Sequence, residues 1–314
     1  MKAIGGYFGL ELHDGFEYHA DAIRLNTGRN ALEYILIAKK YKKIYLPYFT
    51  CKVLLEPIKN NCISYEYYCI NENFEADFNF DNLKEEECFL YTNYFGFKEE
   101  YILSLTKKCN NLIIDNAQAF YAKPVQGITT FYSPRKFFGV PDGAYLYTDI
   151  KMETPLKKDY SSQRFEHLLE RIDKSAEVGY SKFVENDDSL SDLPLMEMSN
   201  ITQKMLQSID YNHIAVKRCE NFKFLSKHLK GINKIDFELN ENHIPMVYPF
   251  FSDDISLRKK LMVNKIYTGQ YWKEVQNLVQ MNSVEYQFAN HLVHLPVDQR
   301  YNEIDLKRIV DLLM

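Results

Sequence analysis

The chain has 314 residues, a length that accommodates one large domain and a smaller one. Hydrophobic residues make up 46% and charged residues 26%, a balance typical of globular proteins that argues against extended disorder. The formal net charge is −5 and the pI is near 6.0, with Lys and Arg scattered along the chain. This charge distribution argues against a protein that binds nucleic acid.

The beginning of the sequence lacks the basic and apolar regions of a secretory signal peptide, and no apolar run approaches the ~20 residues that span a bilayer. We therefore expect a cytoplasmic protein without membrane contacts. The six cysteines contain no CxxC pair, so reduced thiols are expected. The eight histidines form no HExxH or Cys/His ligand pattern, which argues against a metal site.

Short β-rich runs alternate with helical stretches over the first two-thirds of the chain, the pattern of a mostly parallel sheet covered by helices. Apolar residues at helical spacing predict a first helix over 31–43. Further helices are predicted over 53–60 and 98–109, and strands over 42–49, 64–70, 88–95, 111–115, 128–133 and 144–149.

The second half of the chain begins with a charged, helical stretch over 157–191 and a long amphipathic helix over 201–229. After these, strands are predicted over 236–239, 246–251 and 291–297, and helices over 256–265 and 303–313. We place a domain boundary inside the long helix. The prediction is a large domain over 15–209 and a small α+β domain over 210–314, with residues 1–14 packed near the small domain.

Thr27, Gly28 and Arg29 stand at the start of the first predicted helix. The free backbone N–H groups and positive dipole end of such a helix favour a bound phosphate. Gly28 would let the backbone approach it closely. A simple helix cap gives the same pattern, and the motif alone favours the cap.

Asp115 follows the apolar run 112–114, which predicts a buried parallel strand that ends in a carboxylate. Open α/β sheets bind ligands at this edge, and a carboxylate there can keep the ring nitrogen of a pyridine-type cofactor protonated. An Asp that caps the following turn is the alternative.

Lys136 lies in the turn-rich segment 131–144, beside Phe137 and Phe138. Partial desolvation or a neighbouring cation makes a lysine amine a nucleophile and proton carrier. An exposed loop lysine is the alternative. None of the three motifs is decisive by itself.

Together and in this order, the motifs resemble those of the DegT/DnrJ/EryC1/StrS family of pyridoxal-phosphate (PLP)-dependent sugar aminotransferases. TGRNAL resembles the family's phosphate-binding segment, IIDNAQAF its Asp-x-Ala-Gln element, and YSPRKFFGVPDGAYL the element that carries the Schiff-base lysine. The resemblance continues through KIYTGQYW and HLPVDQRY and covers about residues 20–314. It implies the aspartate-aminotransferase fold, a three-layer α/β/α large domain with a smaller C-terminal domain.

The resemblance also implies roles for individual residues. Lys136 would bind PLP covalently and move protons, and Asp115 would pair with the ring nitrogen. Gln118 would lie against the ring or reach its phenolic oxygen. The phosphate would be held by Thr27, Gly28, Arg29 and Ser133.

Two further cofactor contacts follow from the resemblance. The PLP ring usually stacks on an aromatic residue from the segment that corresponds to 47–51, where a direct match places Cys51. Tyr48 and Phe49 are the alternatives, and the sequence leaves the choice open. Asn200 resembles an asparagine that reaches the phosphate bound to the partner subunit, so a homodimer is expected.

The chain departs from the family at the lysine element. Pro141-Asp142-Gly143-Ala144 stands where the family has Gly-Glu/Asp-Gly-Gly, and a gapless alignment from Phe131 places Arg135 at the lysine position. We assign Lys136 because a guanidinium group cannot form a Schiff base at accessible pH. The segment before the phosphate motif is also shorter than in the family, and in the family this segment helps to shape the substrate pocket.

The implied function is transfer of an amino group from glutamate to a keto group of a nucleotide-linked sugar, for polysaccharide or glycoconjugate biosynthesis. A PLP-dependent elimination or dehydration is one alternative, but family members that eliminate replace the lysine, so Lys136 argues against it. A non-catalytic PLP-binding regulatory protein is a second, kept open by the altered turn and the short N-terminal segment. A plain α/β scaffold without cofactor would require three coincident motifs.

Overall fold

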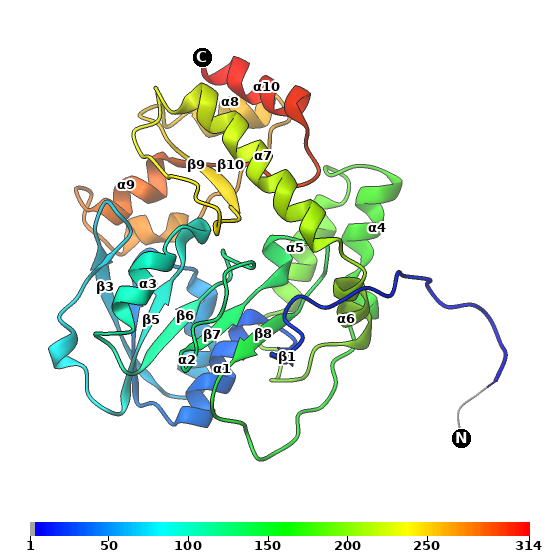
Figure 1. Cartoon of the computed structure of the whole chain (residues 1–314), viewed down its shortest axis with the longest axis vertical. Helices are drawn as coiled ribbons and strands as arrows, with labels where there is room; N and C mark the ends of the chain where they lie inside the picture. The colour runs from blue at the N-terminus through cyan, green and yellow to red at the C-terminus, as the bar shows by residue number, and fades with distance from the viewer. Residues whose placement is uncertain (1–3) are drawn as a thin grey trace.

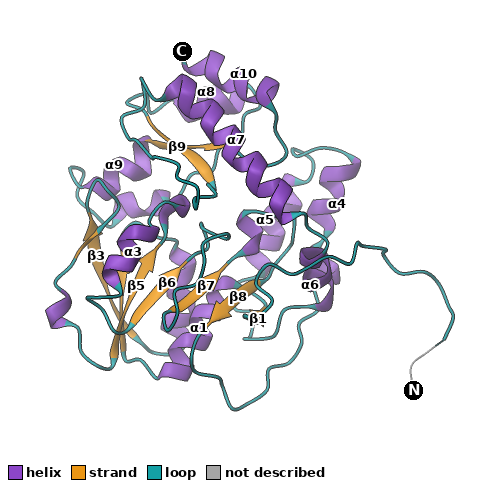
Figure 2. Ribbon diagram, viewed as in Figure 1, coloured by secondary structure: helices purple, strands orange, loops and turns teal. Residues whose placement is uncertain are grey.

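The computed structural model describes residues 4–314, and its largest element is an eight-stranded sheet (Figures 1 and 2). The strands lie in the order β1 (Ile23–Leu25), β8 (Ala144–Tyr147), β7 (Thr129–Tyr132), β6 (Leu112–Asp115), β5 (Glu87–Thr92), β2 (Lys43–Pro47), β3 (Ser64–Ile70) and β4 (Ala76–Asp77). The five central strands β7, β6, β5, β2 and β3 are parallel, and the flanking strands pair antiparallel. The predicted α/β fold with a mostly parallel sheet is confirmed.

Helices cover both faces of this sheet, which explains why its central strands are apolar on both sides. On one face, α1 (Gly28–Lys39) and α2 (Leu55–Asn60) pack against side chains such as Leu90 and Ile113. On the other face, α3 (Glu99–Leu105) packs against Tyr91 and the alternate side chains of the same strands. The sheet therefore forms the middle of three layers.

The C-terminal part of the chain packs above the carboxyl edge of the sheet (Figure 1). It contains the antiparallel pair β9 (Val247–Phe251) and β10 (Leu292–Pro296), with helices α7 (Tyr211–Leu229), α8 (Leu257–Val263), α9 (Val284–His291) and α10 (Glu303–Leu313). Side chains such as Phe222, Tyr248 and Leu306 form a core of its own, and others join the core of the large sheet. The division at residue 210 stays a prediction.

Two predicted elements differ in the structure. The long helix is broken between α6 (Asn200–Gln207) and α7, because the side chain of Asp210 accepts a hydrogen bond from the His213 backbone N–H at 2.9 Å and caps a new helix. The strand predicted over 236–239 is not formed. The edge of β9 away from β10 is bonded by the Asn233 side chain instead, which accepts from the Phe251 N–H and donates to the Pro249 carbonyl, both at 2.9 Å. The helical character of 157–191 is confirmed by α4 (Glu166–Asp173) and α5 (Tyr180–Ser189).

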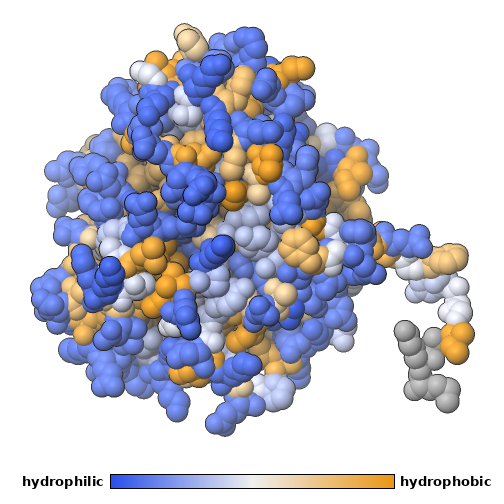
Figure 3. Space-filling model, in the orientation of Figure 1, coloured by the Kyte–Doolittle hydropathy of each residue, from blue (hydrophilic) through white to orange (hydrophobic). Residues whose placement is uncertain are grey.

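The N-terminal segment extends away from the body as an arm without helix or strand (Figures 1 and 3). Residues 4–11 are exposed and do not show the packing near the small domain that we expected of residues 1–14, and residues 1–3 lie outside the described range. The arm joins the body at Asp14, which forms an ion pair with Lys204 of α6. None of the helices within residues 4–314 is long and apolar enough to cross a membrane.

Candidate active site

The carboxyl ends of β6 and β7 bring two of the predicted site residues to one edge of the sheet. Asp115 is the last residue of β6 and pairs in register with Phe131 of the parallel strand β7. Three residues after Phe131 a 3₁₀ turn begins, Pro134–Lys136. Because the strands are adjacent and parallel, Asp115 and Lys136 meet where α/β sheets bind ligands.

Asp115 is a buried carboxyl group without a cationic partner. Its side chain is 6% exposed, and its Oδ1 accepts a hydrogen bond from the Ala117 backbone N–H at 2.8 Å. Burial raises the pKa of Asp115 to about 6, while the Ala117 N–H and the positive charge of Lys136 act in the opposite direction. No Lys, Arg or His of residues 4–314 forms an ion pair with it. The carboxylate is therefore available to a cationic group of a ligand.

The two neighbouring cations of the 3₁₀ turn have different environments. Arg135 donates to Asp187 of α5, with 3.0 Å between Nη1 and Oδ1. Lys136 is exposed, and its Nζ lies 5.8 Å from the centre of the Tyr271 ring. Arg135 is thus engaged on the surface of α5, whereas Lys136 faces the site and its amine is free to react.

The predicted phosphate motif and the lysine element approach one another at the start of α1. A Cβ added to Gly28 would lie 3.9 Å from the Cβ of Ser133. The Thr27 hydroxyl caps the helix, because it accepts from the Asn30 backbone N–H at 3.1 Å and donates to the Asn30 side chain. The side chain of Arg29 is also engaged in hydrogen bonds within the protein.

The Arg29 guanidinium donates to Glu56 at 2.7 Å and to Ser191 at 3.1 Å. The backbone N–H groups of Gly28 and Arg29 make no hydrogen bond within residues 4–314. These two N–H groups and the Ser133 hydroxyl are therefore the donors that the corner offers to a phosphate.

Gln118 and Asn200 have distinct positions. Gln118 is 4% exposed, and its Oε1 accepts from the Phe95 backbone N–H at 3.0 Å, which leaves its amide nitrogen as the group that could reach a cofactor oxygen. Asn200 is the exposed first residue of α6, after the capping residue Ser199. Its predicted contact with a partner subunit stays a prediction.

The three candidates for the residue that stacks on the PLP ring, Tyr48, Phe49 and Cys51, have different environments. Phe49 is fully buried and packs edge-on against Trp272, with 4.7 Å between ring centres. Tyr48 stacks on Tyr67 at 4.8 Å. Burial raises the pKa of the Cys51 thiol. The positive charge of Lys136 acts in the opposite direction. The choice of the stacking residue among Cys51, Tyr48 and Phe49 therefore stays a prediction.

Sequence reasoning missed Tyr271 as a site residue. Its ring faces Lys136 at 5.8 Å and contacts the buried His294 ring at 4.2 Å. Burial raises the pKa of Tyr271, and the charges of Lys136 and Arg218 oppose this. In the sequence, only its place in the segment KIYTGQYW pointed to a role for Tyr271. This loop reaches the site because the C-terminal part folds over the sheet, which no local pattern indicates.

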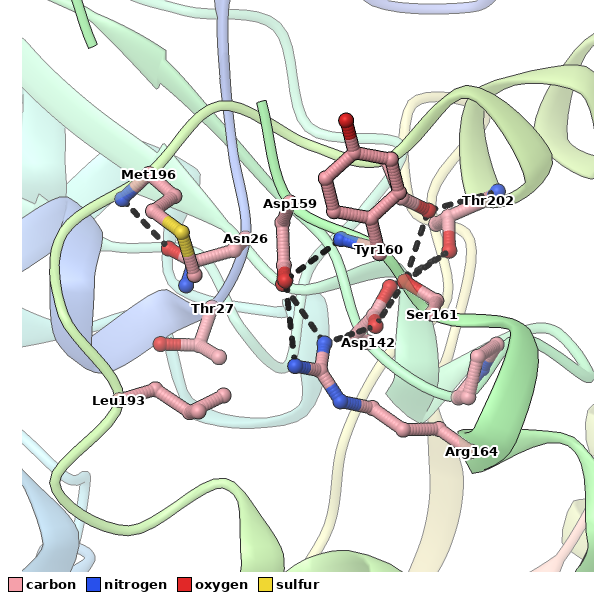
Figure 4. Close-up of polar contacts among 12 residues, drawn as sticks. Asn26, Thr27, Asp142, Asp159, Tyr160, Ser161, Arg164, Leu193, Met196 and Thr202 are labelled. Carbon is pink, nitrogen blue, oxygen red and sulfur yellow. Dashed lines mark hydrogen bonds and ion pairs between the residues drawn. The ribbon is translucent and has the colours of Figure 1, made fainter. Parts of the chain in front are cut away.

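A buried polar network supports the turn that follows Lys136 (Figure 4). Asp142 is fully buried and accepts from Ser161 and Thr202 hydroxyls, each at 2.5 Å, and from Arg164 at 2.7 Å. Arg164 also binds Asp159, at 2.6 Å. The element in which the chain departs from the family pattern is thus held by specific contacts.

Replacing Asp142 with alanine is expected to lower the free energy of unfolding by about 3 kcal/mol, because two hydroxyls and part of a guanidinium lose their buried acceptor. Urea denaturation would measure this. Asp187→Ala is the matched control, since it removes the ion pair of Arg135 from a side chain that is 51% exposed and should cost less than about 1 kcal/mol. Equal losses in the two variants would contradict the supporting role of the network.

The fold matches that of solved structures. Sugar aminotransferase CalS13 from Micromonospora echinospora superimposes over 93% of this chain and 86% of its own, with 14% identity and a TM-score of 0.63. Spr1654 from Streptococcus pneumoniae in its PMP-form superimposes over 93% of this chain and 86% of its own, with 15% identity and a TM-score of 0.65. The aminotransferase from Psychrobacter cryohalolentis superimposes over 94% of this chain and 87% of its own, with 16% identity and a TM-score of 0.62. The fold is the one that sugar aminotransferases have.

These identities are low, so the likeness establishes the fold and leaves the chemistry to the residues of this chain. No protein-family model and no curated protein sequence matches the chain. The shared fold nevertheless explains the geometry of the site, because it brings the ends of β6 and β7, the start of α1 and the C-terminal part to one place.

Proposed function

We propose that this protein is a PLP-dependent aminotransferase whose cofactor is bound covalently to Lys136. One observation carries the proposal: a buried carboxyl group without an ion-pair partner, Asp115, lies at the same carboxyl edge of the sheet as an exposed lysine. Buried carboxylates are normally paired, so one without a partner favours a cationic ligand group.

The residues present fit PLP at each of its polar groups. Asp115 would pair with the protonated ring nitrogen, and the amide nitrogen of Gln118 would donate to the phenolic oxygen. The free N–H groups of Gly28 and Arg29, with the Ser133 hydroxyl, would hold the phosphate. One of the structural neighbours, Spr1654, was solved in a PLP-form, which supports the same cofactor for this fold.

Bound PLP supplies an electron sink for a carbanion at the substrate α-carbon. The Lys136 amine would take the proton from this carbon as general base and deliver it to C4′ of the cofactor as general acid. The Asp115 carboxylate would keep the ring nitrogen protonated, and its burial strengthens this interaction because few water dipoles screen it. Tyr271 lies beside the lysine, with 5.8 Å between Nζ and its ring centre, and its ring would limit the access of water to the reacting atoms from that side.

For the substrates we propose glutamate as amino donor and a keto group on a nucleotide-linked sugar as acceptor. The names of the neighbours CalS13 and Spr1654 as sugar aminotransferases support a sugar acceptor. The exposed position of Asn200 at the start of α6 supports a homodimer in which it contacts the partner's cofactor. A place in polysaccharide or glycoconjugate biosynthesis follows from that substrate class.

The proposal is tested by the absorption spectrum of the purified protein with added PLP, before and after L-glutamate. We expect a band near ~420 nm that shifts to ~330 nm when the donor half-reaction takes place. A band that does not shift with any amino donor would indicate a regulatory PLP-binding protein or another PLP reaction. No band at saturating PLP would reject the cofactor.

A further inference from the structure

Arg218 of α7 is the largest side chain that the fold buries completely, with 1% exposure. Its Nη1 donates to the carbonyl oxygens of Pro245 at 3.1 Å and Met246 at 3.0 Å. Its Nη2 donates to the carbonyl oxygen of Phe137 at 3.2 Å. A guanidinium buried among backbone carbonyls is unusual, because arginine is rarely buried without a carboxylate.

The charge of Arg218 has no ion-pair partner in the part of the chain that the structure describes. The nearby carboxylate of Asp298 is bound by Arg300 instead, with 2.6 Å from Nε to Oδ1 and 2.9 Å from Nη2 to Oδ2. In addition, the Nε of Arg218 is buried without an acceptor. Such an arrangement costs stability relative to an apolar side chain, so packing alone does not account for it.

The contact with Phe137 shows where this charge acts. Phe137 directly follows Lys136, and its ring lies against the Arg218 guanidinium, with 4.5 Å between Cζ and the ring centre. The Phe137 carbonyl oxygen accepts a second hydrogen bond, from Gln299 Nε2 at 3.2 Å. Two donors from the C-terminal part, on α7 and after β10, therefore hold the peptide group next to the lysine.

Other contacts of this turn come from the turn itself, from Asp187 of α5, which pairs with Arg135, and from Tyr211 of α7, whose ring lies 5.3 Å from that of Phe138. Phe137 and Phe138 donate their N–H groups to the Pro134 carbonyl, both at 2.9 Å. The 3₁₀ turn is short, so these bonds fix its pitch without fixing its orientation toward Asp115. Through the Phe137 carbonyl, the backbone of the turn is hydrogen-bonded to the C-terminal part of the chain.

We propose that Arg218 and Gln299 form a carbonyl clamp that positions Lys136: by holding the Phe137 carbonyl, the C-terminal part orients the lysine toward the cofactor site. Neither residue touches the reacting atoms, so both are positioning residues. The proposal rests on the proposed function for its link to the cofactor. The clamp itself is a statement about the protein alone.

The clamp is tested with Arg218→Met and, in case that variant is poorly folded, Gln299→Leu, which removes only the second donor. The matched control is Arg258→Met. Arg258 also donates to a backbone carbonyl, that of Leu292 at 2.8 Å, and also has a buried Nε without partner, but it does not contact the lysine turn. All variants and the wild type are studied as full chains.

The first measurement is backbone hydrogen exchange over residues 133–140 without added PLP. We expect exchange at Phe137 and Phe138 to become about tenfold faster in Arg218→Met and several-fold faster in Gln299→Leu, and to stay unchanged in Arg258→Met. Unchanged protection in both clamp variants, or the same increase in the control, overturns the proposal.

The second measurement is the rate at which added PLP forms its ~420 nm band, a readout that loss of stability elsewhere would not alter. We expect this rate to fall about tenfold in Arg218→Met and to be retained in Arg258→Met, with partial recovery in Arg218→Lys. Band formation at the control rate in both clamp variants overturns the positioning role even if exchange is faster. Absence of the band in the wild type rejects the proposed function instead, so the two failures are distinguishable.

Discussion

Replacing Lys136 with alanine is expected to abolish the ~420 nm band and to lower transamination at least about 1,000-fold, because the variant loses both the covalent attachment of PLP and the proton-transfer group. Spectra and single-turnover reactions with L-glutamate would measure the two effects. PLP would still bind non-covalently, since the phosphate corner and Asp115 are unchanged.

Arg135→Ala is the matched control for this experiment. It removes the cation next in sequence, on the same 3₁₀ turn, whose guanidinium is engaged with Asp187 3.0 Å away on α5. We expect this variant to keep the band and most of the activity. A band that persists in Lys136→Ala would reject Lys136 as the attachment residue, and with it the geometry of the whole site.

Replacing Asp115 with asparagine is expected to lower turnover about 100-fold or more, because a neutral amide cannot stabilise a protonated ring nitrogen. The same change should stabilise the protein without PLP at pH 8, by up to about 3 kcal/mol, because it removes the cost of a buried anion. The amide oxygen can still accept the hydrogen bond from the Ala117 N–H. Activity and stability would thus change in opposite directions.

The pH dependence has a definite sign. Burial raises the pKa of Asp115 from 3.8 to about 6, so between these values the folded chain holds a proton that the unfolded chain has lost. The favourable contribution of protonated Asp115 to the free energy of unfolding is therefore complete below pH 3.8 and is lost as the pH rises through 6. Urea denaturation of Asp115→Asn and wild type should show a smaller difference at pH 5 than at pH 8.

Saturating PLP provides the control for Asp115→Asn. The cofactor gives the wild-type carboxylate its cationic partner, so the wild type should gain more stability from PLP than the variant does. An Asp115→Asn variant that binds PLP as well as the wild type and keeps its turnover would contradict the role of this carboxyl group.

Much of the large sheet could be predicted from the sequence because its signals are local, whereas the site residues were inferred from the order of three motifs and the family resemblance that they carry. Apolar runs such as 112–114 predict buried parallel strands, and the residue that follows such a run must lie at the carboxyl edge, as Asp115 does. A helix start after Thr27 depends on capping, which nearest neighbours determine.

The tertiary structure decided which side chains of those segments face the site. The sequence left Cys51, Tyr48 and Phe49 as alternatives, and the packing of Phe49 against Trp272 takes that ring into the core. Likewise, the ion pair of Arg135 with α5 separates it from Lys136. In both cases the partner lies far along the chain, so no local pattern could indicate it.

The same reason explains the remaining differences. Whether residues 236–239 form a strand depends on a neighbouring strand with free backbone groups, and the Asn233 side chain bonds the open edge of β9. Tyr271 and Arg218 reach the lysine because the C-terminal part folds over the carboxyl edge of the sheet. The sequence by itself determined the periodic elements and the residue types at their ends, since these depend on neighbours along the chain. Only the tertiary structure decided which side chains share the site, because those contacts join segments that the sequence holds far apart.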